Sequence, residues 1–364
     1  MRIAVIDLDN LKNPFWAAGQ ARSTREIYKR LSERHDITVY CAKYPGYQDY
    51  HEDGIFYKHV GALVNQPQIS NLLFLLYIPL LVRKIEADII IENFNAPTGV
   101  SFSPLFTRIP VLGIPTMFNA REFSKKYHLP FHWIERLGIK FYKYMVAYSE
   151  IDSTKINRLA PHTVCRIIPQ GVGEEFFRVK HRLPIHILFL GRYDMWQKGI
   201  DLLLHAYVKV KDRIGYPLVL AGHGSDEDKI RKLISQLDLQ DKVHLVGKAY
   251  GEKKNDLISD ALFVAFPSRH DEISLWSLEA LASGLPLIAF DLPECHWISD
   301  KVSLKARPFD IDEYAKILLQ AKDNKVLENM KRESRIFASR YSWDTVAQQY
   351  ERFILDIYDR EKHE

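Results

Sequence analysis

Residues 262–289 read LFVAFPSRHDEISLWSLEALASGLPLIA and carry the clearest pattern of secondary structure in the chain. An apolar run, Leu262–Phe266, leads into a polar loop, a helical segment begins around Ser274–Trp276, and a second apolar run follows at Pro286–Ala289. Short apolar runs on either side of a helix are typical of a buried parallel sheet, in which the helix connects neighbouring strands. The stretch therefore predicts one strand–helix–strand unit of an α/β domain.

Apolar runs of this kind recur through the whole chain and separate into two series. The first comprises Ile3–Ile6, Ile37–Tyr40, Asp88–Ile91, Val111–Ile114, Met145–Tyr148 and Arg166–Ile168, and the second comprises Ile185–Leu190, Leu218–Ala221, Val243–Val246, Leu262–Phe266 and Pro286–Ala289. Longer amphipathic segments lie between the runs, as in doubly wound sheets. The length of 364 residues also fits two domains. We therefore expect an α/β protein with two doubly wound, Rossmann-like domains that face a cleft.

The start of the second series sets the expected domain boundaries. The two halves join near residues 178–184, so we expect an N-terminal domain at 1–180 and a C-terminal domain at 181–342. Ser342-Trp343 then opens a long amphipathic segment. We expect this segment, residues 343–364, to form a helix that packs back on the N-terminal domain.

Composition argues against several classes of protein. Hydrophobic residues make up 47% of the chain and charged residues 26%, which is typical of a folded globular protein. The net charge of +4 is too small to indicate a nucleic-acid-binding protein. The three cysteines, Cys41, Cys165 and Cys295, lie far apart with no CxxC motif, so we expect neither a zinc site nor a disulfide framework.

Two basic residues follow the first apolar run of the second series. Arg192 comes just after Leu190, and Lys198 precedes the next helical segment. The planar fork of an arginine and the point charge of a lysine near a helix start suit a diphosphate. The amides at the helix start near Ser274 and Leu275 offer a further anion site. Such basic pairs are also common in solvated loops. The spacing of Arg192 and Lys198 alone does not distinguish a diphosphate site from a solvated loop.

Two carboxylates flank the start of the same helical segment. Asp271 lies in the polar loop, and Glu279 lies about one turn inside the helix, with seven residues between them. Both can face one ligand from different distances. The alternative interpretation is a solvated acidic loop beside a surface glutamate.

The surrounding sequence resembles that of a known family. The pattern PS…D-x7-E-A-x-A-x-G-x-P, from Pro267 to Pro286, closely resembles the acid-seven-Glu signature of the retaining, GT-B-fold glycosyltransferases of family 4. The segment from Gly191-Arg192 to Lys198-Gly199 is similar to the G-R-x(4–5)-K-G element of the same family. The resemblance extends from Gly19 to the Ser342-Trp343 helix and is more specific in the second half of the chain.

The resemblance implies transfer of a sugar, with retention, from a UDP- or GDP-linked donor to an acceptor hydroxyl, without a cofactor or metal. Arg192 and Lys198 would stabilise the departing diphosphate, Asp271 would hold the donor sugar, and Glu279 would accept hydrogen bonds from the ribose. Further donor-binding positions implied in this way are Gly191, Gly222, Gly224, Glu272, Ile273, Ser274 and Leu275.

Three departures from the family pattern bear on the site. Asp271 stands where Glu is commoner and Glu272 follows where Gly is frequent, which leaves open which of the two contacts the sugar. The family commonly has a histidine after the strand that corresponds to Val111–Ile114; here Asn119 or the backbone would take its place on the acceptor side. The loop that ends at Gly19 resembles the family's glycine-rich loop but keeps one of its two glycines.

Other functional classes stay open as alternatives. A non-hydrolysing sugar-nucleotide epimerase shares the expected fold, and a catalytically silent member would bind the nucleotide or glycan only. An NAD enzyme is disfavoured because the three-glycine loop is missing after Ile6. Asp7-Leu8-Asp9 mimics a DxD metal motif, but its place at the end of the first strand is wrong for that motif, so we predict no metal site.

Basic and aromatic residues alternate in Arg121–Lys143, which suits an anionic membrane surface. The nearby apolar stretch Leu72–Val82 is eleven residues long and contains Pro79, whereas a spanning helix needs about 20 residues. An ordinary core helix with a basic surface is the alternative interpretation. We expect a cytoplasmic protein, peripheral on the membrane as a further hypothesis, with a glycan or lipid-linked acceptor and no nucleic-acid partner.

Overall fold

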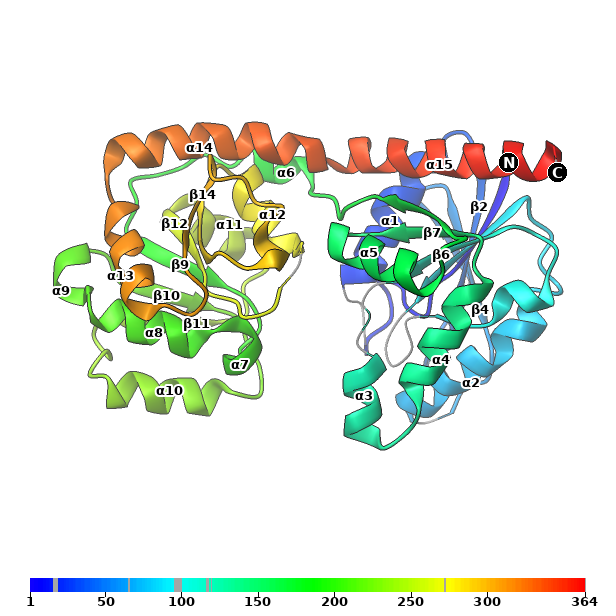
Figure 1. The fold of residues 1–364 in the computed structure, drawn as a ribbon, viewed down its shortest axis with the longest axis horizontal. Helices are drawn as coiled ribbons and strands as arrows, with labels where there is room; N and C mark the ends of the chain where they lie inside the picture. Colours follow the sequence, from blue (N-terminus) through cyan, green and yellow to red (C-terminus); the bar gives the residue numbers. More distant parts are fainter. Residues whose placement is uncertain are drawn as a thin grey trace. The chain divides into compact units, whose positions relative to one another are not determined.

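The computed structural model describes residues 1–15, 19–64, 66–94, 100–115, 118, 120–271 and 273–363. The chain divides into two compact units (Figure 1). The first unit joins Met1–Gln170 to Trp343–Glu364, and the second unit is Gly171–Ser342. Each unit is a largely parallel sheet with helices packed on it.

The first unit is built on an eight-stranded sheet in the order β3-β4-β2-β1-β5-β6-β7-β8. The strands are β1 (Arg2–Ile6), β2 (Asp36–Ala42), β3 (Tyr50–Glu52), β4 (Ile55–Val60), β5 (Ile89–Phe94), β6 (Val111–Pro115), β7 (Tyr144–Ala147) and β8 (Val164–Ile167). All neighbours pair in parallel except β3 and β4. The central strands are buried along their whole length, which explains their continuous apolar runs.

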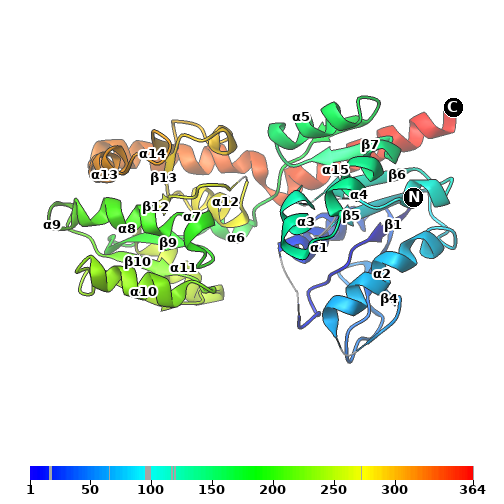
Figure 2. The same ribbon diagram turned by 60° about the horizontal axis from the view of Figure 1, so that its bottom comes forward.

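Among the described residues, five longer helices accompany this sheet before the chain enters the second unit (Figure 2). They are α1 (Gly19–Leu31), α2 (Pro67–Leu81), α3 (Ala120–Tyr127), α4 (Phe131–Gly138) and α5 (Glu150–Leu159), with short 3-10 turns η1 (Ser103–Phe106) and η2 (Ile139–Phe141) between them. The helix α1 begins at Gly19, directly after the undescribed residues 16–18.

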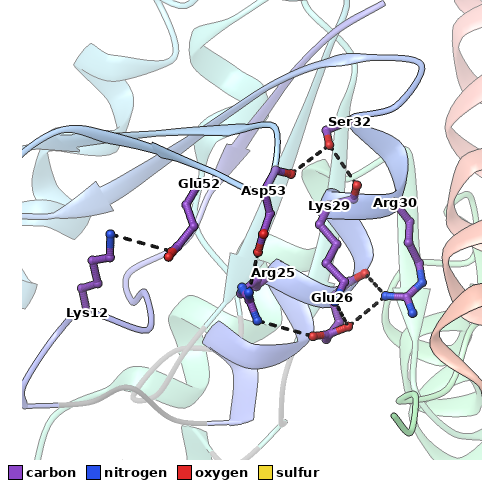
Figure 3. Close-up of polar contacts among 8 residues, drawn as sticks. All are labelled: Lys12, Arg25, Glu26, Lys29, Arg30, Ser32, Glu52 and Asp53. Carbon is purple, nitrogen blue, oxygen red and sulfur yellow. Dashed lines mark hydrogen bonds and ion pairs between the residues drawn. The ribbon is translucent and has the colours of Figure 1, made fainter. Parts of the chain in front are cut away.

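The β3–β4 hairpin was not predicted from the sequence. Its turn is Asp53-Gly54, whose φ angles of 52° and 77° are those that aspartate and glycine tolerate in a two-residue hairpin turn. Arg25 of α1 pairs with Asp53 at 2.5 Å, and the hydroxyl of Ser32 donates to the carbonyl of Asp53 at 3.1 Å (Figure 3). These contacts hold the hairpin against α1.

The C-terminal helix α15 (Trp343–His363) packs on α1 within the first unit. Its residues Val346, Tyr350 and Ile354 are fully buried. At its start, Arg30 of α1 pairs with Asp344 at 2.5 Å. The same guanidinium binds Glu26 of α1 at 2.8 Å (Figure 3). The last segment of the chain therefore completes the core of its first unit.

The second unit is built on a six-stranded parallel sheet in the order β11-β10-β9-β12-β13-β14. The strands are β9 (His186–Leu190), β10 (Leu218–Ala221), β11 (Val243–Gly247), β12 (Ala261–Phe266), β13 (Leu287–Phe290) and β14 (Ser303–Ala306). The helices are α6 (Glu174–Phe177), α7 (Met195–Lys198), α8 (Ile200–Val208), α9 (Lys211–Ile214), α10 (Glu227–Gln236), α11 (Gly251–Ser259), α12 (Leu275–Ala282), α13 (Ile311–Gln320) and α14 (Asn324–Ala338), with 3-10 turns η3 (Pro293–Cys295) and η4 (Ser339–Tyr341). The edge strand β14 was not predicted, because its sequence SLKA has no continuous apolar run.

The expected fold class, two α/β doubly wound units, is confirmed. In both sheets the order of the chain reverses beside the first strand of the unit: β1 lies between β2 and β5, and β9 lies between β10 and β12. Loops that leave adjacent strands on the two sides of such a reversal diverge to opposite faces of the sheet, so a crevice forms at the carboxyl ends of these strands. The topology thus gives each unit one preferred place for a ligand.

The packing of α15 on the first unit can be tested by comparing two neighbouring residues. Ile354→Ala should lower the free energy of unfolding by about 2–5 kcal/mol, because it leaves a cavity in the core. Leu355→Ala should change it by less than about 0.5 kcal/mol, because Leu355 is 39% exposed. Urea unfolding followed by circular dichroism measures both. Equal effects of the two substitutions would contradict the packing.

Candidate functional site

The candidate site lies in the second unit, where the loops leave β9, β10 and β12. These strands are neighbours in the parallel sheet, so their carboxyl ends lie at one edge. Gly191 follows β9, Gly222 follows β10 and Pro267 follows β12. The residues predicted for donor binding in this unit therefore come from loops that leave the edge where doubly wound sheets bind ligands.

Gly222 and Gly224 pack directly against the loop that follows β9. The amide of Tyr193 donates to the carbonyl of His223 at 2.8 Å. A Cβ atom at position 222 would lie 1.8 Å from the carbonyl oxygen of Gly191, and one at position 224 would lie 2.3 Å from that of Tyr193. Any side chain at either position would force the two backbones apart. The GxG turn thus sets how closely the two loops approach.

Lys198 and Asp271 form a buried ion pair. Lys198 is the last residue of α7, and Asp271 lies in the loop between β12 and α12. Their side chains, 9% and 12% exposed, form a salt bridge, and the hydroxyl of Ser268 donates to the same carboxylate oxygen at 3.2 Å. Away from water, such a pair attracts more strongly than on the surface. The structure therefore brings together two of the residues predicted to be catalytic.

Arg192 is exposed and reaches the same loop through a neutral side chain. Its Nη2 donates to Oε1 of Gln197 at 2.7 Å, and Nε2 of Gln197 donates to the carbonyl of His270 at 3.3 Å. The Arg192 guanidinium is therefore held next to the segment that carries Lys198, without a carboxylate partner among the residues described. It is the cation of this site whose charge is least compensated.

Sequence reasoning missed Arg269, which fixes the loop after β12. Its guanidinium binds both carboxylate oxygens of Asp201 in α8, at 2.8 and 2.6 Å. Its amide donates to the carbonyl of Gln197 at 2.9 Å. Two parallel N–H···O bonds give a rigid geometry. In the sequence, Arg269 is a single cation in a polar loop, four residues before Ile273. Single cations in loops are too common to indicate a role.

The start of α12 supplies backbone amides next to this loop. Ser274 is the N-cap, and its hydroxyl oxygen accepts from the amide of Ser277 at 3.4 Å. The Ser274 hydroxyl is thus occupied in capping the helix. The groups that can bind an anion are the first backbone amides of the helix, from Leu275 onward. Ile273 packs partly buried against the core. Glu272, also predicted for donor binding, lies outside the described residues.

Trp276 is a second group that sequence reasoning missed. Its ring packs edge-on against Phe266 at 5.1 Å between centroids. Its indole Nε1 is buried, has no hydrogen-bond partner among the described residues, and would lie 4.0 Å from a Cβ atom at Gly191. A buried donor without a partner costs about 1–3 kcal/mol. The indole N–H is therefore a buried, unsatisfied donor close to the loop after β9.

Glu279 is buried inside α12 and pairs with Lys254 of α11. The ammonium of Lys254 also lies 5.0 Å from the centre of the Phe176 ring, within the range of a cation–π contact. Lys254 was not predicted as a site residue, because α11 follows a strand that carries no motif. The Glu279 carboxylate is therefore oriented by a cation from α11.

Two family models match this chain and together account for most of it. The model described as Glycosyltransferase Family 4 matches residues 17–176, and the model described as Glycosyl transferases group 1 matches residues 184–324. The chain belongs to the glycosyltransferases of family 4.

Curated relatives and a solved structure agree with this family. A phosphatidyl-myo-inositol mannosyltransferase of Mycobacterium tuberculosis is 30% identical over 53% of this chain and 53% of its own length. A GDP-mannose:cellobiosyl-diphosphopolyprenol alpha-mannosyltransferase of Xanthomonas oryzae pv. oryzae is 25% identical over 64% of this chain and 63% of its own. The matches thus span about half to two thirds of these relatives. A sucrose-phosphate synthase from Thermosynechococcus elongatus has the same GT-B fold, with a TM-score of 0.77 at 18% identity over 99% of both chains.

In the first unit of this family 4 protein, the structure describes only part of the predicted acceptor side. Gly19 is the first residue of α1, and its carbonyl accepts from the hydroxyl of Ser23 at 3.0 Å. Asn119 lies outside the described residues.

A buried polar cluster at the carboxyl ends of β1 and β5 was also missed. Oδ2 of Asp7 accepts from the hydroxyl of Thr24 at 2.5 Å and from the amide group of Asn93 at 2.8 Å. Burial raises the pKa of Asp7 to about 6, although these hydrogen bonds favour the ionised form. In the sequence, Asp7-Leu8-Asp9 mimics a DxD metal motif and the nucleophile loop of phosphatases that use an aspartate, and neither motif predicts this cluster. The cluster ties α1 to both strands at the reversal of the first sheet.

The raised pKa of Asp7 makes the stability of this family 4 protein depend on pH. A carboxyl that binds its proton more tightly in the folded chain contributes stability below its unfolded pKa, near 3.8, and loses it as the pH rises through about 6. In Asp7→Asn this titration is absent. The wild type should therefore lose about 2 kcal/mol of unfolding free energy relative to the variant between about pH 4 and pH 7. Urea unfolding at both pH values measures the difference, and parallel pH profiles would contradict the assignment.

Proposed function

We propose that this protein is a retaining, metal-independent glycosyltransferase that moves a sugar from a nucleotide-diphosphate donor to a lipid-linked acceptor. The observation that carries the proposal is the arrangement of Arg192, the Lys198–Asp271 pair and the start of α12 around loops that leave one sheet edge. A diphosphate and a sugar need cations and hydrogen-bond acceptors side by side, and these loops supply both.

The cations act on the leaving group in this proposal. When the bond between the sugar and the diphosphate breaks, negative charge grows on the diphosphate. Arg192, Lys198 and the amides at the start of α12 would stabilise that charge more in the transition state than in the bound donor. They would take the part that a divalent metal plays elsewhere, and no resident cofactor is needed. Asp271 would hold the sugar hydroxyls, and retention rests on the family resemblance.

The relatives' names support the choice of donor and acceptor. One relative is named for GDP-mannose and a diphosphopolyprenol acceptor, and the other for phosphatidyl-myo-inositol. Both are mannosyltransferases that act on a lipid. We therefore propose a glycolipid acceptor and GDP-mannose as the first donor to assay, with UDP-sugars as the second series.

The role of the cations can be tested by two single substitutions. Arg192→Ala and Lys198→Ala should each lower kcat by about 10²–10³-fold, the usual effect of losing one preorganised electrostatic group. Transfer of radiolabelled sugar from the donor to a lipid fraction measures kcat, and nuclear magnetic resonance of the anomeric proton reports retention.

Arg231→Ala is the matched control, because Arg231 is an exposed cation on α10 of the same unit, paired with Glu227. It should leave kcat unchanged. Near-normal turnover in both Arg192→Ala and Lys198→Ala would disprove the proposed electrostatic role, and an inverted product would disprove retention.

The role of Glu279 is tested by nucleotide binding alone. Glu279→Gln keeps the shape of the side chain but removes the charged carboxylate that would accept hydrogen bonds from the ribose hydroxyls. The Kd of GDP or UDP should therefore rise about 10-fold or more. Titration calorimetry measures it. Glu252→Gln, an exposed glutamate on α11 two residues before Lys254, is the control and should bind as the wild type does. An unchanged Kd in Glu279→Gln would rule out the ribose contact.

A further inference from the structure

The helix α2 exposes an apolar face. Its sequence, PQISNLLFLLYIPLL, contains no charged residue. Phe74, Ile78 and Leu81 are buried in the core of the first unit. The opposite face carries Leu72, Leu76 and Leu80, which are 55%, 66% and 51% exposed. A helix on the surface of a globular protein normally has charged or polar residues there.

Exposed apolar residues also lie on three further elements, η1, α4 and η2. The Arg83 guanidinium, just after α2, lies 5.1 Å from the ring centre of Phe106 in η1, and Phe102, which precedes η1, packs on Phe141 of η2 at 5.8 Å. These contacts link the end of α2, through η1, to the end of α4. Along this path the exposed apolar side chains are Leu72, Leu76, Leu80, Leu105, Trp133, Leu137 and Phe141, with exposures between 42% and 66%. We call this set the apolar strip.

Exposed cations without a described carboxylate partner lie beside the apolar strip. The exposed cations beside it are Arg83, Lys84, Arg108, Arg136 and Lys140, none of which has a carboxylate partner among the described residues. The acidic residue of α4, Glu135, is instead buried and pairs with Lys155 at 3.3 Å. In α4 and η2, Trp133, Arg136, Leu137 and Lys140 share one helical face by their spacing. Apolar and cationic side chains therefore point outward together.

We propose that the apolar strip and its cations form a docking surface for an anionic phospholipid bilayer, with the leucines of α2 inserted at the level of the acyl chains. None of the described helices is long and apolar enough to cross a membrane. A helix with one apolar face and flanking cations lies in the plane of the interface, where burial of apolar area and attraction to anionic headgroups add. The proposal rests on the proposed function in one respect, since a lipid-linked acceptor resides in such a bilayer.

The charges favour a bilayer over a second copy of this chain. In a two-fold dimer the same patch meets itself, so the cations around one strip would face the cations around the other. An anionic surface compensates these charges instead. The apolar strip and the cations thus point to one occupant.

The experiment measures binding to vesicles by co-sedimentation. The vesicles contain phosphatidylglycerol and phosphatidylcholine in a one-to-two ratio, and vesicles of phosphatidylcholine alone are compared with them at low and high salt. The test variant is Leu72→Gln/Leu76→Gln/Leu80→Gln. The matched control is Leu183→Gln/Ile185→Gln/Ile336→Gln, which changes three exposed apolar residues of the second unit.

We expect the wild type and the control to bind the anionic vesicles, more weakly at high salt. The α2 variant should bind at least about a hundredfold more weakly, because each leucine that leaves water contributes about tenfold. Arg136→Gln/Lys140→Gln should weaken binding to anionic vesicles by about fivefold per cation and leave binding to neutral vesicles unchanged.

Three results would overturn the docking surface: no binding of the wild type, equal binding of the α2 variant, or a wild-type dimer in sedimentation velocity that the α2 variant dissociates. The last result would identify the strip as a contact between copies. Calorimetry with GDP and UDP on the same samples separates this proposal from the proposed function. Nucleotide binding without vesicle binding defeats only the docking surface, whereas a wild type that binds vesicles but no nucleotide defeats the proposed function.

Discussion

Backbone contact between loops at the carboxyl ends of β9, β10 and β12 is the constraint on which the candidate site depends. A Cβ atom at Gly222 would lie 1.8 Å from the Gly191 carbonyl oxygen, and one at Gly199 would lie 2.0 Å from the Pro267 carbonyl oxygen. At Gly199 the φ angle of 63° independently favours glycine. Arg192, Lys198 and Asp271 all project from these loops, so their mutual distances follow from how closely the backbones approach. The glycines therefore determine the chemistry of the site indirectly, by allowing the loops that carry the charges to pack together.

Two cations of the site are paired with carboxylates. Lys198 binds Asp271 and Lys254 binds Glu279, with all four side chains largely buried. A buried pair is strongly destabilised if only one partner is removed, because the remaining charge is left away from water. A diphosphate that binds Lys198 must therefore compete with Asp271, and the displaced carboxylate needs new donors. Sugar hydroxyls are such donors, so a ligand that carries both phosphate and sugar satisfies both halves of the pair at once. A nucleotide without a sugar satisfies only one.

The sequence predicted the fold class and most of the strands, because buried parallel strands carry continuous apolar runs that are visible locally. It missed β14, whose SLKA sequence lacks such a run, and the β3–β4 hairpin, although its Asp53-Gly54 turn was a usable local signal. The Lys198–Asp271 pair joins residues 73 positions apart and could be expected only because both belong to recognised segments. Lys254 had no such context, and Trp276 lies within a recognised segment but at one of its variable positions. Their relation to the site arises from helix packing, which periodicity does not encode.

The exposed leucines on the outer face of α2 are not needed for folding, and the proposed contact with a bilayer gives them a role. Phe74, Ile78 and Leu81 already supply the apolar contacts that hold this helix on the sheet. Glutamine or glutamate at positions 72, 76 and 80 would form a helix about as well as leucine does. Leucines at these positions therefore add little to the folded state and create an exposed patch of the kind that promotes association. The buried position of Glu135 removes the one acidic charge of α4 from the same surface. The exposed apolar residues and the cations beside them are independent features of the sequence. A bilayer with anionic headgroups and apolar acyl chains would complement both.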